Sequence, residues 1–431
     1  MAAENEKLEQ ADSPFPTLND LVFEKKKKVV LLLSQGLLKC GCPCHRVEDT
    51  LQHTASSLGI NASFSFLPDS VLITFSHPED DSDTQSVMVK SPQSYDTGKI
   101  GQINRTMNSL HKDEMDIDTC ITRLSEIMAA PPTCGFIATC LAFSLSAFSA
   151  SALLFSGSWM DAGVSGALGL IVALLFILSN HYPIYGRVFE VSSSVIVALI
   201  ARALHRYCCF TSVAVSAILI LLPGYAMTMA VVELSARHVT TGTIRLVYSI
   251  VYAFVLAYGL QVGSSVYSAI DPSVSDQDTC ANAVSPWFYI PLFPLLSISI
   301  ALSFGSSHKQ WPTQTFCAAI GFCLSYFLGH IIPDSQVVGS LASFAVGLYA
   351  NFALKITGEA PLVPLCVGVT LLVPGSIGVR GAYALLHQDD LGHSLFPLQM
   401  LTIALGLSTG LFAAAMIVYP SGKKRSLYIS F

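Results

Sequence analysis

The order of hydrophobic and polar positions divides the chain into a head with mixed periodicity and a long apolar body. In the head, apolar residues recur at helical spacing, change to short apolar and aromatic runs, and then return to helical spacing. This order predicts helices over 21–39, 45–58, 98–111 and 117–130 and strands over 62–67, 71–75 and 86–90. We therefore expect a small α+β domain over 21–131, preceded by a polar, disordered N-terminus over 1–20.

From residue 136 onward, apolar segments reach the length of about 20 residues that a helix needs to cross a bilayer. We expect ten spans, near 136–156, 162–180, 188–204, 208–234, 244–265, 287–304, 313–332, 336–354, 361–386 and 395–418. The fourth and ninth spans are interrupted. The predicted fold class is a multi-pass α-helical membrane protein, with five-span units over 132–265 and 286–418 and a tail over 419–431.

Lysine and arginine residues in the short connections predict the orientation. If the N-terminus is cytosolic, the cytosolic side holds nine of them: Arg123, Arg187, Arg237, Arg245, Lys309, Lys355, Lys423, Lys424 and Arg425. The outer side holds three: Arg202, Arg206 and Arg380. We therefore expect a cytosolic head, both termini in the cytosol, an outward-facing loop over 266–285 and a place in the plasma membrane.

A repeat relates the two five-span units. The sequence from Ile220 to Gly224, Ile-Leu-Leu-Pro-Gly, returns 151 residues later as Leu-Leu-Val-Pro-Gly from Leu371 to Gly375. A second echo pairs Ala201-Arg202 with Ala350-Asn351. Because five is odd, the second unit enters the membrane from the opposite side, which is the inverted repeat of many secondary transporters.

The two Pro-Gly pairs interrupt helices at membrane depth. Pro223-Gly224 and Pro374-Gly375 each stop an apolar segment that is too short to cross the bilayer alone. Proline removes a backbone donor and glycine weakens the helix, so backbone groups are freed where only a cavity or a ligand can satisfy them. Matched interruptions predict a transport site, although one such pair alone would indicate a packing kink.

The composition agrees with a membrane body and excludes nucleic-acid binding. Charged residues number 31 in the first 131 positions and 21 in the remaining 300. The mean hydropathy of the chain is +0.57. The formal net charge of −6 leaves no basic face of the kind that a nucleic-acid groove needs.

The twelve cysteines lie mostly in apolar runs, so we expect no disulfide framework. Cys40, Cys42 and Cys44 stand at alternate positions beside His45 and could ligate zinc or copper. No second Cys/His cluster in the head completes a structural site. We therefore expect neither a metal nor a cofactor, and the role of the cluster stays open.

Three charged residues inside the spans are candidates for function, because an ionisable group at membrane depth costs roughly 2.5 kcal/mol or more. They are Glu190, Glu233 and Arg380. An apolar environment would favour the neutral acid at Glu233, which suits a proton carrier, and Arg380 could hold a substrate carboxylate with two hydrogen bonds. Glu190 and Arg202 could also be interfacial, with Arg202 reaching the outer surface.

Five motifs together resemble the threonine/serine exporter family: CHRVEDTLQHTASSLGI, FLPDSVLITF, GKIGQINRTMNSLHKDEMDIDTCITRLSEI, LLPGYAMTMAVVELSARHVTTGTIRL and LVPGSIGVRG. The resemblance covers about 25–418. It implies a cytosolic head before ten spans and the export of small hydrophilic metabolites, driven by an ion or proton gradient. In some bacterial members the two halves are separate chains, and one such pair is linked to dicarboxylate export.

The resemblance also points to particular residues. Arg46 and Glu48 match an Arg-X-Glu signature of the head, which we expect to pair locally or to dock the head rather than to catalyse a reaction. Glu233 matches the acidic position after the first Pro-Gly motif, and Arg380 matches the basic position after the second. The departure is the cysteine cluster over 40–44, where relatives tend to carry small residues.

Other classes of function remain as alternatives. Gly163-Val-Ser165-Gly166 has the form used by rhomboid-type serine proteases, but His181 and His330 lie at the ends of spans, so a catalytic pair is not expected. Gly163, Gly166 and Gly169 would more simply form a close-packing face. A membrane sensor with a cytosolic head is compatible with the composition. We expect a transporter rather than an enzyme, most simply for threonine or serine, with a dicarboxylate as alternative substrate; a homo-oligomer is left open.

Overall fold

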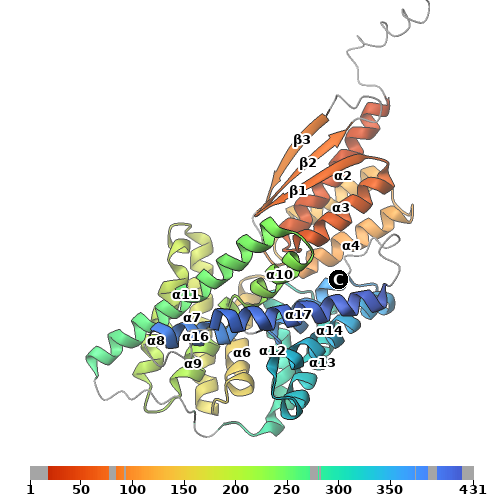
Figure 1. Ribbon diagram of the computed structural model, residues 1–431. Helices are drawn as coiled ribbons and strands as arrows, with labels where there is room; N and C mark the ends of the chain where they lie inside the picture. The colour runs from red at the N-terminus through yellow and green to blue at the C-terminus, as the bar shows by residue number, and fades with distance from the viewer. Residues whose placement is uncertain are drawn as a thin grey trace, which may run out of the picture.

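The computed structural model describes residues 18–76, 84–91, 94–271, 280, 283–373, 375–386 and 396–419, without the side chains of 18–20, 385 and 396. A head made from the N-terminal residues lies at one end of a larger body of helices (Figure 1). The C-terminal end of the last helix lies on the same side of the body as the head (Figure 1).

The head contains the four helices and three strands that its periodicity predicts. They are α2 (Leu18–Lys39), α3 (Cys44–Leu58), β1 (Asn61–Leu67), β2 (Ser70–Ser76), β3 (Thr84–Lys90), α4 (Thr97–His111) and α5 (Ile117–Ala129). The strands form an antiparallel sheet in the order β1-β2-β3, in which Phe64 is opposite Ile73 and Ile73 is opposite Val87. The sheet lies along one side of the helices (Figure 1).

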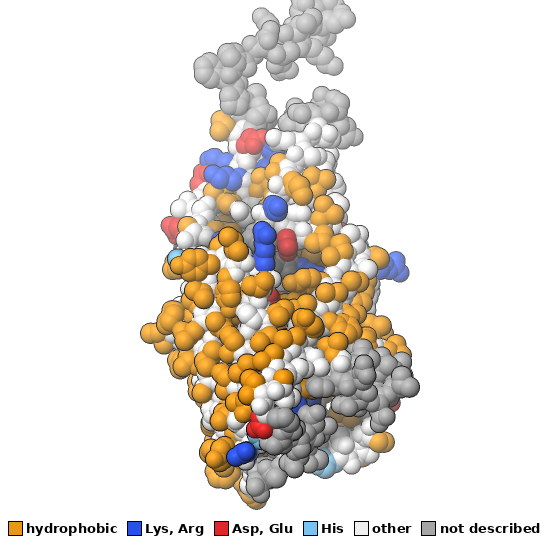
Figure 2. Space-filling view, turned by 90° about the vertical axis from the view of Figure 1, so that its left-hand side faces the viewer, with side chains coloured by type: hydrophobic (Ala, Val, Ile, Leu, Met, Phe, Trp, Pro, Cys, Tyr) orange, Lys and Arg blue, Asp and Glu red, His pale blue; other side chains and the backbone are white. Residues whose placement is uncertain are grey.

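The body consists of helices from α6 to α17. They are α6 (Phe136–Leu154), α7 (Trp159–His181), α8 (Phe189–Ala203), α9 (Phe210–Ala217), α10 (Gly224–Ser235), α11 (Val239–Ile270), α12 (Tyr289–Ser303), α13 (Trp311–Ile331), α14 (Ser335–Thr357), α15 (Leu362–Thr370), α16 (Gly375–Leu386) and α17 (Phe396–Val418). Hydrophobic side chains cover the face of the body in Figure 2, whereas charged side chains gather on and near the head. Such a surface is that of a protein embedded in lipid.

Eight helical segments of the described chain are long and apolar enough to span a membrane. The pair α9 and α10, bent by 60° at its break, would add a ninth. The third expected span is the helix α8, whose 15 residues extend only about 22 Å and fall short of a bilayer core. The membrane-protein class is therefore confirmed, while the count of ten and the inverted repeat stay predictions.

Glycines bring neighbouring helices of the body into close contact. A Cβ on Gly169 of α7 would lie 2.6 Å from the carbonyl oxygen of Phe143 on α6, and Gly166 packs on Phe148. Within the described residues, no atom lies within 4 Å of the position of a Cβ on Gly163. Two of the three glycines thus form the expected close-packing face, and Gly163 does not take part.

Candidate functional site

The two interrupted helices meet at their breaks. Pro223 precedes α10, Gly375 begins α16, and Pro374 lies outside the described residues. A Cβ on Gly224 would lie 2.9 Å from both the Cα and the backbone nitrogen of Gly375. A Cβ on Gly375 would lie 3.3 Å from the Cα of Gly224. The backbones of the two halves therefore touch at positions where only glycine leaves room.

This contact brings the N-termini of α10 and α16 to one place. The first amides of a helix have no partner within the helix and carry a partial positive charge, so two such ends together favour an anion. Thr228 lies one turn into α10, on the same face as Gly224. Its hydroxyl is fully buried and has no hydrogen-bond partner among the described residues. The junction thus offers unused polar groups to a small ligand.

Glu233 lies near the other end of α10, and its side chain is completely buried. One carboxylate oxygen, Oε1, accepts a hydrogen bond of 2.6 Å from Nη1 of Arg245 and one of 2.9 Å from the backbone amide of Cys44. The other oxygen, Oε2, has no partner among the described residues. The acidic residue therefore joins three elements: α10, α11 and the first residue of α3 in the head.

Arg245 closes this junction from α11. Its Nη2 atom lies 3.7 Å from the sulfur of Cys44, and 19% of its side chain is exposed. Burial raises the pKa of Cys44 to about 12, with the nearby Glu233 carboxylate adding to the effect, so the thiol is neutral at physiological pH. The buried ion pair lies within the body, and the head joins it through the backbone amide of Cys44.

The two residues of the head signature take different partners. The carboxylate of Glu48 lies 3.1 Å from Nε2 of His238, which precedes α11. The guanidinium of Arg46 lies 3.6 Å from the carboxylate of Asp49 on the same helix. Burial lowers the pKa of Arg46 to about 10, a value at which the side chain stays charged at neutral pH. Glu48 thus lies at the contact between head and body, and Arg46 has a local ion pair.

A second set of contacts joins the head to the other half of the body. The backbone amides of Thr97 and Gly98 donate to the carbonyl oxygens of Phe304 and Gly305, at 2.9 and 3.0 Å. The hydroxyls of Thr97 and Ser306 are 2.7 Å apart. The head therefore contacts the connection between α12 and α13 as well as the turn between α10 and α11.

Three aromatic rings fill the space between these two contacts. Tyr95 comes from the head, Tyr225 from α10, and Phe304 from the end of α12. The ring centroids are 4.9 to 5.7 Å apart, with edge-to-face geometry in each pair. Such pairs stabilise by about 0.5–1.5 kcal/mol each beyond the area that they bury. Head, first half and second half meet at this cluster.

A family model described as "Putative threonine/serine exporter" matches residues 28–267. The chain belongs to this family. An uncharacterized protein of Schizosaccharomyces pombe is 26% identical over 94% of this chain and 57% of its own length. Pheromone-regulated membrane protein 10 of Kluyveromyces lactis is 26% identical over 93% of this chain and 44% of its own length. The protein of that name in Saccharomyces cerevisiae is 26% identical over 93% of this chain and 55% of its own length.

The chain thus spans about half the length of the curated relatives that it matches. No solved structure matches it. The resemblance to the threonine/serine exporter family that the motifs carry is confirmed by the family match. The names of these relatives state neither a substrate nor an ion.

The other two charged candidates of this family member lie apart from Glu233. Arg380 is exposed on α16, and Glu190 is half-buried in the first turn of α8. Neither forms a hydrogen bond or ion pair with Glu233. Their roles stay predictions.

Sequence reasoning missed the position of Arg202. Its side chain is 4% exposed, and its guanidinium lies 4.0 Å from the ring centroid of Phe210. It donates to the hydroxyl of Ser264 at 2.8 Å and to that of Tyr383, on α16, at 3.2 Å. Arg202 therefore forms a second contact between the halves. Its match to Asn351 in the sequence repeat was the signal that could have indicated a buried position.

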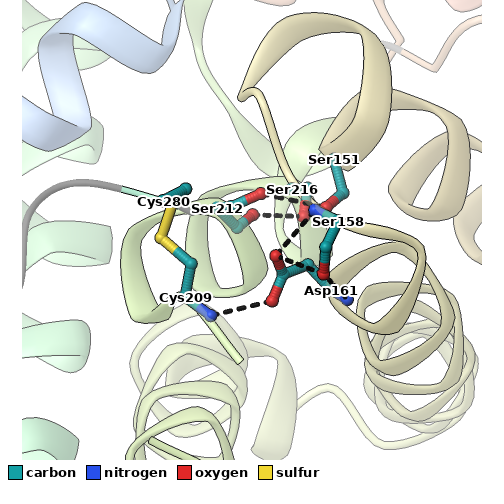
Figure 3. The surroundings of a disulfide bond; sticks show 7 residues. All are labelled: Ser151, Ser158, Asp161, Cys209, Ser212, Ser216 and Cys280. Atoms are coloured by element: carbon teal, nitrogen blue, oxygen red, sulfur yellow. Dashed lines mark hydrogen bonds between the residues drawn. A yellow bond between two sulfur atoms is a disulfide. The ribbon is translucent and has the colours of Figure 1, made fainter. Parts of the chain in front are cut away.

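A disulfide joins Cys209, just before α9, to Cys280 (Figure 3). The expectation of no disulfide framework did not foresee this single bridge, because Cys280 stands alone in a polar loop. Asp161 lies beside it and accepts the backbone amide of Cys209 at 2.7 Å and that of Ser158 at 2.8 Å (Figure 3). The end of the interrupted helix away from Glu233 is thus fixed by a covalent bond and a buried carboxylate.

The serine and cysteine residues considered for a protease or a metal site are buried in the packing of the protein. The hydroxyl of Ser165 lies 2.8 Å from that of Ser216 on α9, so it bonds another serine. Cys40, Cys42 and Cys44 are buried with free thiols. Within the described residues, no group of three or more His, Cys, Asp and Glu side chains could hold a metal ion.

Proposed function

We propose that this protein is a secondary transporter that exports small hydrophilic metabolites, with threonine and serine as its substrates. The contact between the two interrupted helices carries the proposal. Two unwound segments, one from each half, meet where Gly224 packs on Gly375. Irregular backbone inside a membrane body is stable where it lines a cavity or binds a ligand.

The chemistry of this junction suits the carboxylate of an amino acid. The amino ends of α10 and α16 favour a negative group, and the unpaired hydroxyl of Thr228 can bind a polar one. Two helix ends from opposite halves would also suit a ligand with two carboxylates. This second feature favours a dicarboxylate as the other candidate substrate.

The driving force in this proposal is a proton gradient, with Glu233 as the proton carrier. One oxygen of its buried carboxylate has no donor in the part of the chain that the structure describes, which leaves a position for a proton. Arg380 binds the substrate carboxylate on its path. The spans form two inverted five-helix repeats in the plasma membrane.

The proposed orientation places the head and both termini in the cytosol. The disulfide between Cys209 and Cys280 supports it, because disulfides persist on the oxidising side of a membrane. That bridge anchors the loop between the fifth and sixth expected spans, which carries three aspartates and neither lysine nor arginine. Lysine and arginine gather instead in the connections on the side of the head.

The experiment is efflux from proteoliposomes that contain the purified protein. Labelled threonine, serine and succinate are loaded separately, and a pH gradient is imposed. We expect gradient-dependent efflux of threonine or serine, with succinate efflux favouring the dicarboxylate reading. Binding of these compounds without any efflux would favour a sensor instead and would contradict transport.

A further inference from the structure

We propose that Glu233 holds the head on the body only while it is ionised, and that Arg245 sets the pH at which the head is released. The inference extends the proposed function, on which its role in transport rests. The release of the head itself is a separate event that can be measured without transport.

The geometry of Oε1 carries the first step. This one atom accepts a bond from Arg245 of the body and a bond from the amide of Cys44, which is the first residue of α3 in the head. Hydrogen bonds to an ionised carboxylate are roughly twice as strong as those to a neutral group. The amino end of α3 also attracts negative charge. Protonation of Glu233 would therefore weaken both bonds, of which the one from Cys44 attaches the head.

The other oxygen supplies the place for the proton. Oε2 of Glu233 is buried and has no partner among the described residues. The other member of the pair, Arg245, has 19% of its side chain exposed to solvent.

The surrounding charges decide which state prevails. Arg245 on α11 is the cation in direct contact with Glu233. The other titratable or charged groups near this pair are the thiol of Cys44, His45, Arg46 and Glu48 on α3, Tyr95 before α4, Asp69 between β1 and β2, and His238 before α11. Because Arg245 is the residue that forms an ion pair with Glu233 in the described part of the chain, its removal should favour proton binding most.

Release of Cys44 would loosen the head at the turn between α10 and α11, where Glu48 also contacts His238. The attachment of the head at Thr97 is formed by hydroxyl and backbone groups and does not involve Glu233. The head would then pivot on the second half and uncover the end of α10. Protonation of Glu233 and opening of the body on the side of the head would then occur together.

The experiment measures the distance between head and body by electron–electron double resonance. Spin labels are attached to Met88→Cys on β3 and Ile356→Cys at the end of α14, two exposed positions. The background lacks Cys134, Cys140 and Cys323, the free cysteines that are not buried among the described residues. We expect one short distance at pH 8 and a second, longer one that grows as the pH falls.

Variants separate the roles of the two partners. Glu233→Gln should show the longer distance at every pH, whereas Glu233→Asp should keep the response to pH and serves as the folding control. Arg245→Gln should move the midpoint of the transition to higher pH by about one unit or more, since an opposite charge stabilises an ionised acid by that much. Arg245→Lys keeps the positive charge, so its midpoint should stay close to that of the unmodified protein.

Two exposed charges on α5 provide matched controls: Glu126→Gln and Arg123→Gln. Both should behave as the unmodified protein. We call the bond between Cys44 and Glu233 the latch. A distance that is independent of pH, or a Glu233→Gln variant whose distances equal those of the unmodified protein, would overturn the proposal that this latch opens on protonation. Loss of efflux with a normal pH-dependent distance would contradict the transport proposal and leave the latch supported.

Discussion

The hydroxyl of Thr97 lies 2.7 Å from the hydroxyl of Ser306, and this contact ties the head to the second half of the body. Cys44 ties the same head to the first half through Glu233. A head that holds both halves restricts their relative motion. Since alternating access requires one half to move against the other, the head should influence transport although it lies outside the helical body.

A covalent link between head and second half tests this influence. In a Cys134→Ala background, which removes a thiol near Ser306, the pair Thr97→Cys and Ser306→Cys should form a disulfide because their side chains already touch. If Thr97 acts as a pivot, the link leaves efflux near its normal rate. Efflux is compared before and after reduction, with each single cysteine variant treated in the same way to correct for reduction of the native bridge.

A second link, near the bond between Cys44 and Glu233, tests whether the head must move away from the first half. A short bis(methanethiosulfonate) reagent, which forms reducible bonds, would join Glu48→Cys to His238→Cys and so link the head to the turn between α10 and α11. The reagent is needed because the 3.1 Å contact is between the ends of two long side chains, which cysteine does not reach. This link should reduce efflux at least tenfold, and reductant should restore it. Full efflux with the head linked at both places would show that the head need not move.

The packing of Gly224 on Gly375 predicts a strong effect of a single methyl group. Gly224→Ala places a Cβ 2.9 Å from backbone atoms of Gly375, a distance that forces the two halves apart. We expect efflux to fall at least tenfold while the protein still reaches the membrane, because overpacking costs about 1–3 kcal/mol and leaves the fold intact. Efflux and elution from a size-exclusion column measure the two effects.

Gly163→Ala is the matched control, because it changes the same residue type within α7 where no atom lies near the new methyl group. Its efflux should be normal. Pro223→Ala should also lower efflux, by letting the helix continue through the break. Equal efflux in Gly224→Ala and Gly163→Ala would reduce the contact between the halves to ordinary packing.

Glu48 and His238 predict a compensating exchange of charge. Glu48→Lys places a cation next to His238, and His238→Glu places two acids together, so each alone should loosen the head. The double variant restores opposite charges and should recover most of the loss, with a coupling energy of about 0.2–1 kcal/mol for a partly exposed pair. Thermal unfolding of all four proteins gives the coupling, and Gln52→Lys on the same helix is the control. Additive losses would show that the two residues do not interact.

Periodicity was sufficient to predict the elements of the head. Its helices and strands repeat apolar residues at their own spacing, and Gly59, with φ of +68°, ends α3 where the helical pattern stops. The interrupted helices were visible because a Pro-Gly pair recurs at matched positions. Local signals of this kind depend on residues that are near one another in the chain.

The attachment of the head could not be predicted in the same way. Glu233 and Cys44 are 189 residues apart, and Cys209 and Cys280 are 71 apart. Their pairing depends on how the halves pack, which no local pattern encodes. The charge of Glu233 marked it as unusual, but its partner Arg245 was counted only as a cytosolic residue of a connection. Only the structure shows that Arg245 is largely buried and paired with Glu233.

The orientation of the chain is tested by labelling from outside intact cells. A cysteine at Asp276, which lies outside the described residues, should react with a membrane-impermeant maleimide, since the loop over 266–285 is expected to face outward. A cysteine at Ser125, exposed on α5, should react only after permeabilisation. Both are introduced without Cys134, Cys140 and Cys323. The reverse pattern would place the head outside and invert the proposed direction of transport.

The last prediction concerns Arg380, which is exposed on α16 while Val379 and Ala382 beside it are fully buried. A guanidinium facing lipid costs about 2.5–3.5 kcal/mol at the centre of a bilayer. Because Arg380 is predicted to lie within a span, we expect its exposed side chain to face a water-filled path rather than lipid. Arg380→Cys should therefore react with a water-soluble thiol reagent, and threonine should slow the reaction. Arg380→Lys keeps the charge but loses the planar fork, so it should raise KM for efflux by about tenfold with little change in the maximal rate. Arg123→Lys on the exposed face of the head is the control and should leave both constants unchanged. If Arg380→Cys is unreactive and Arg380→Lys transports normally, the arginine is an interfacial anchor, and the carboxylate of the substrate is bound by the helix ends alone.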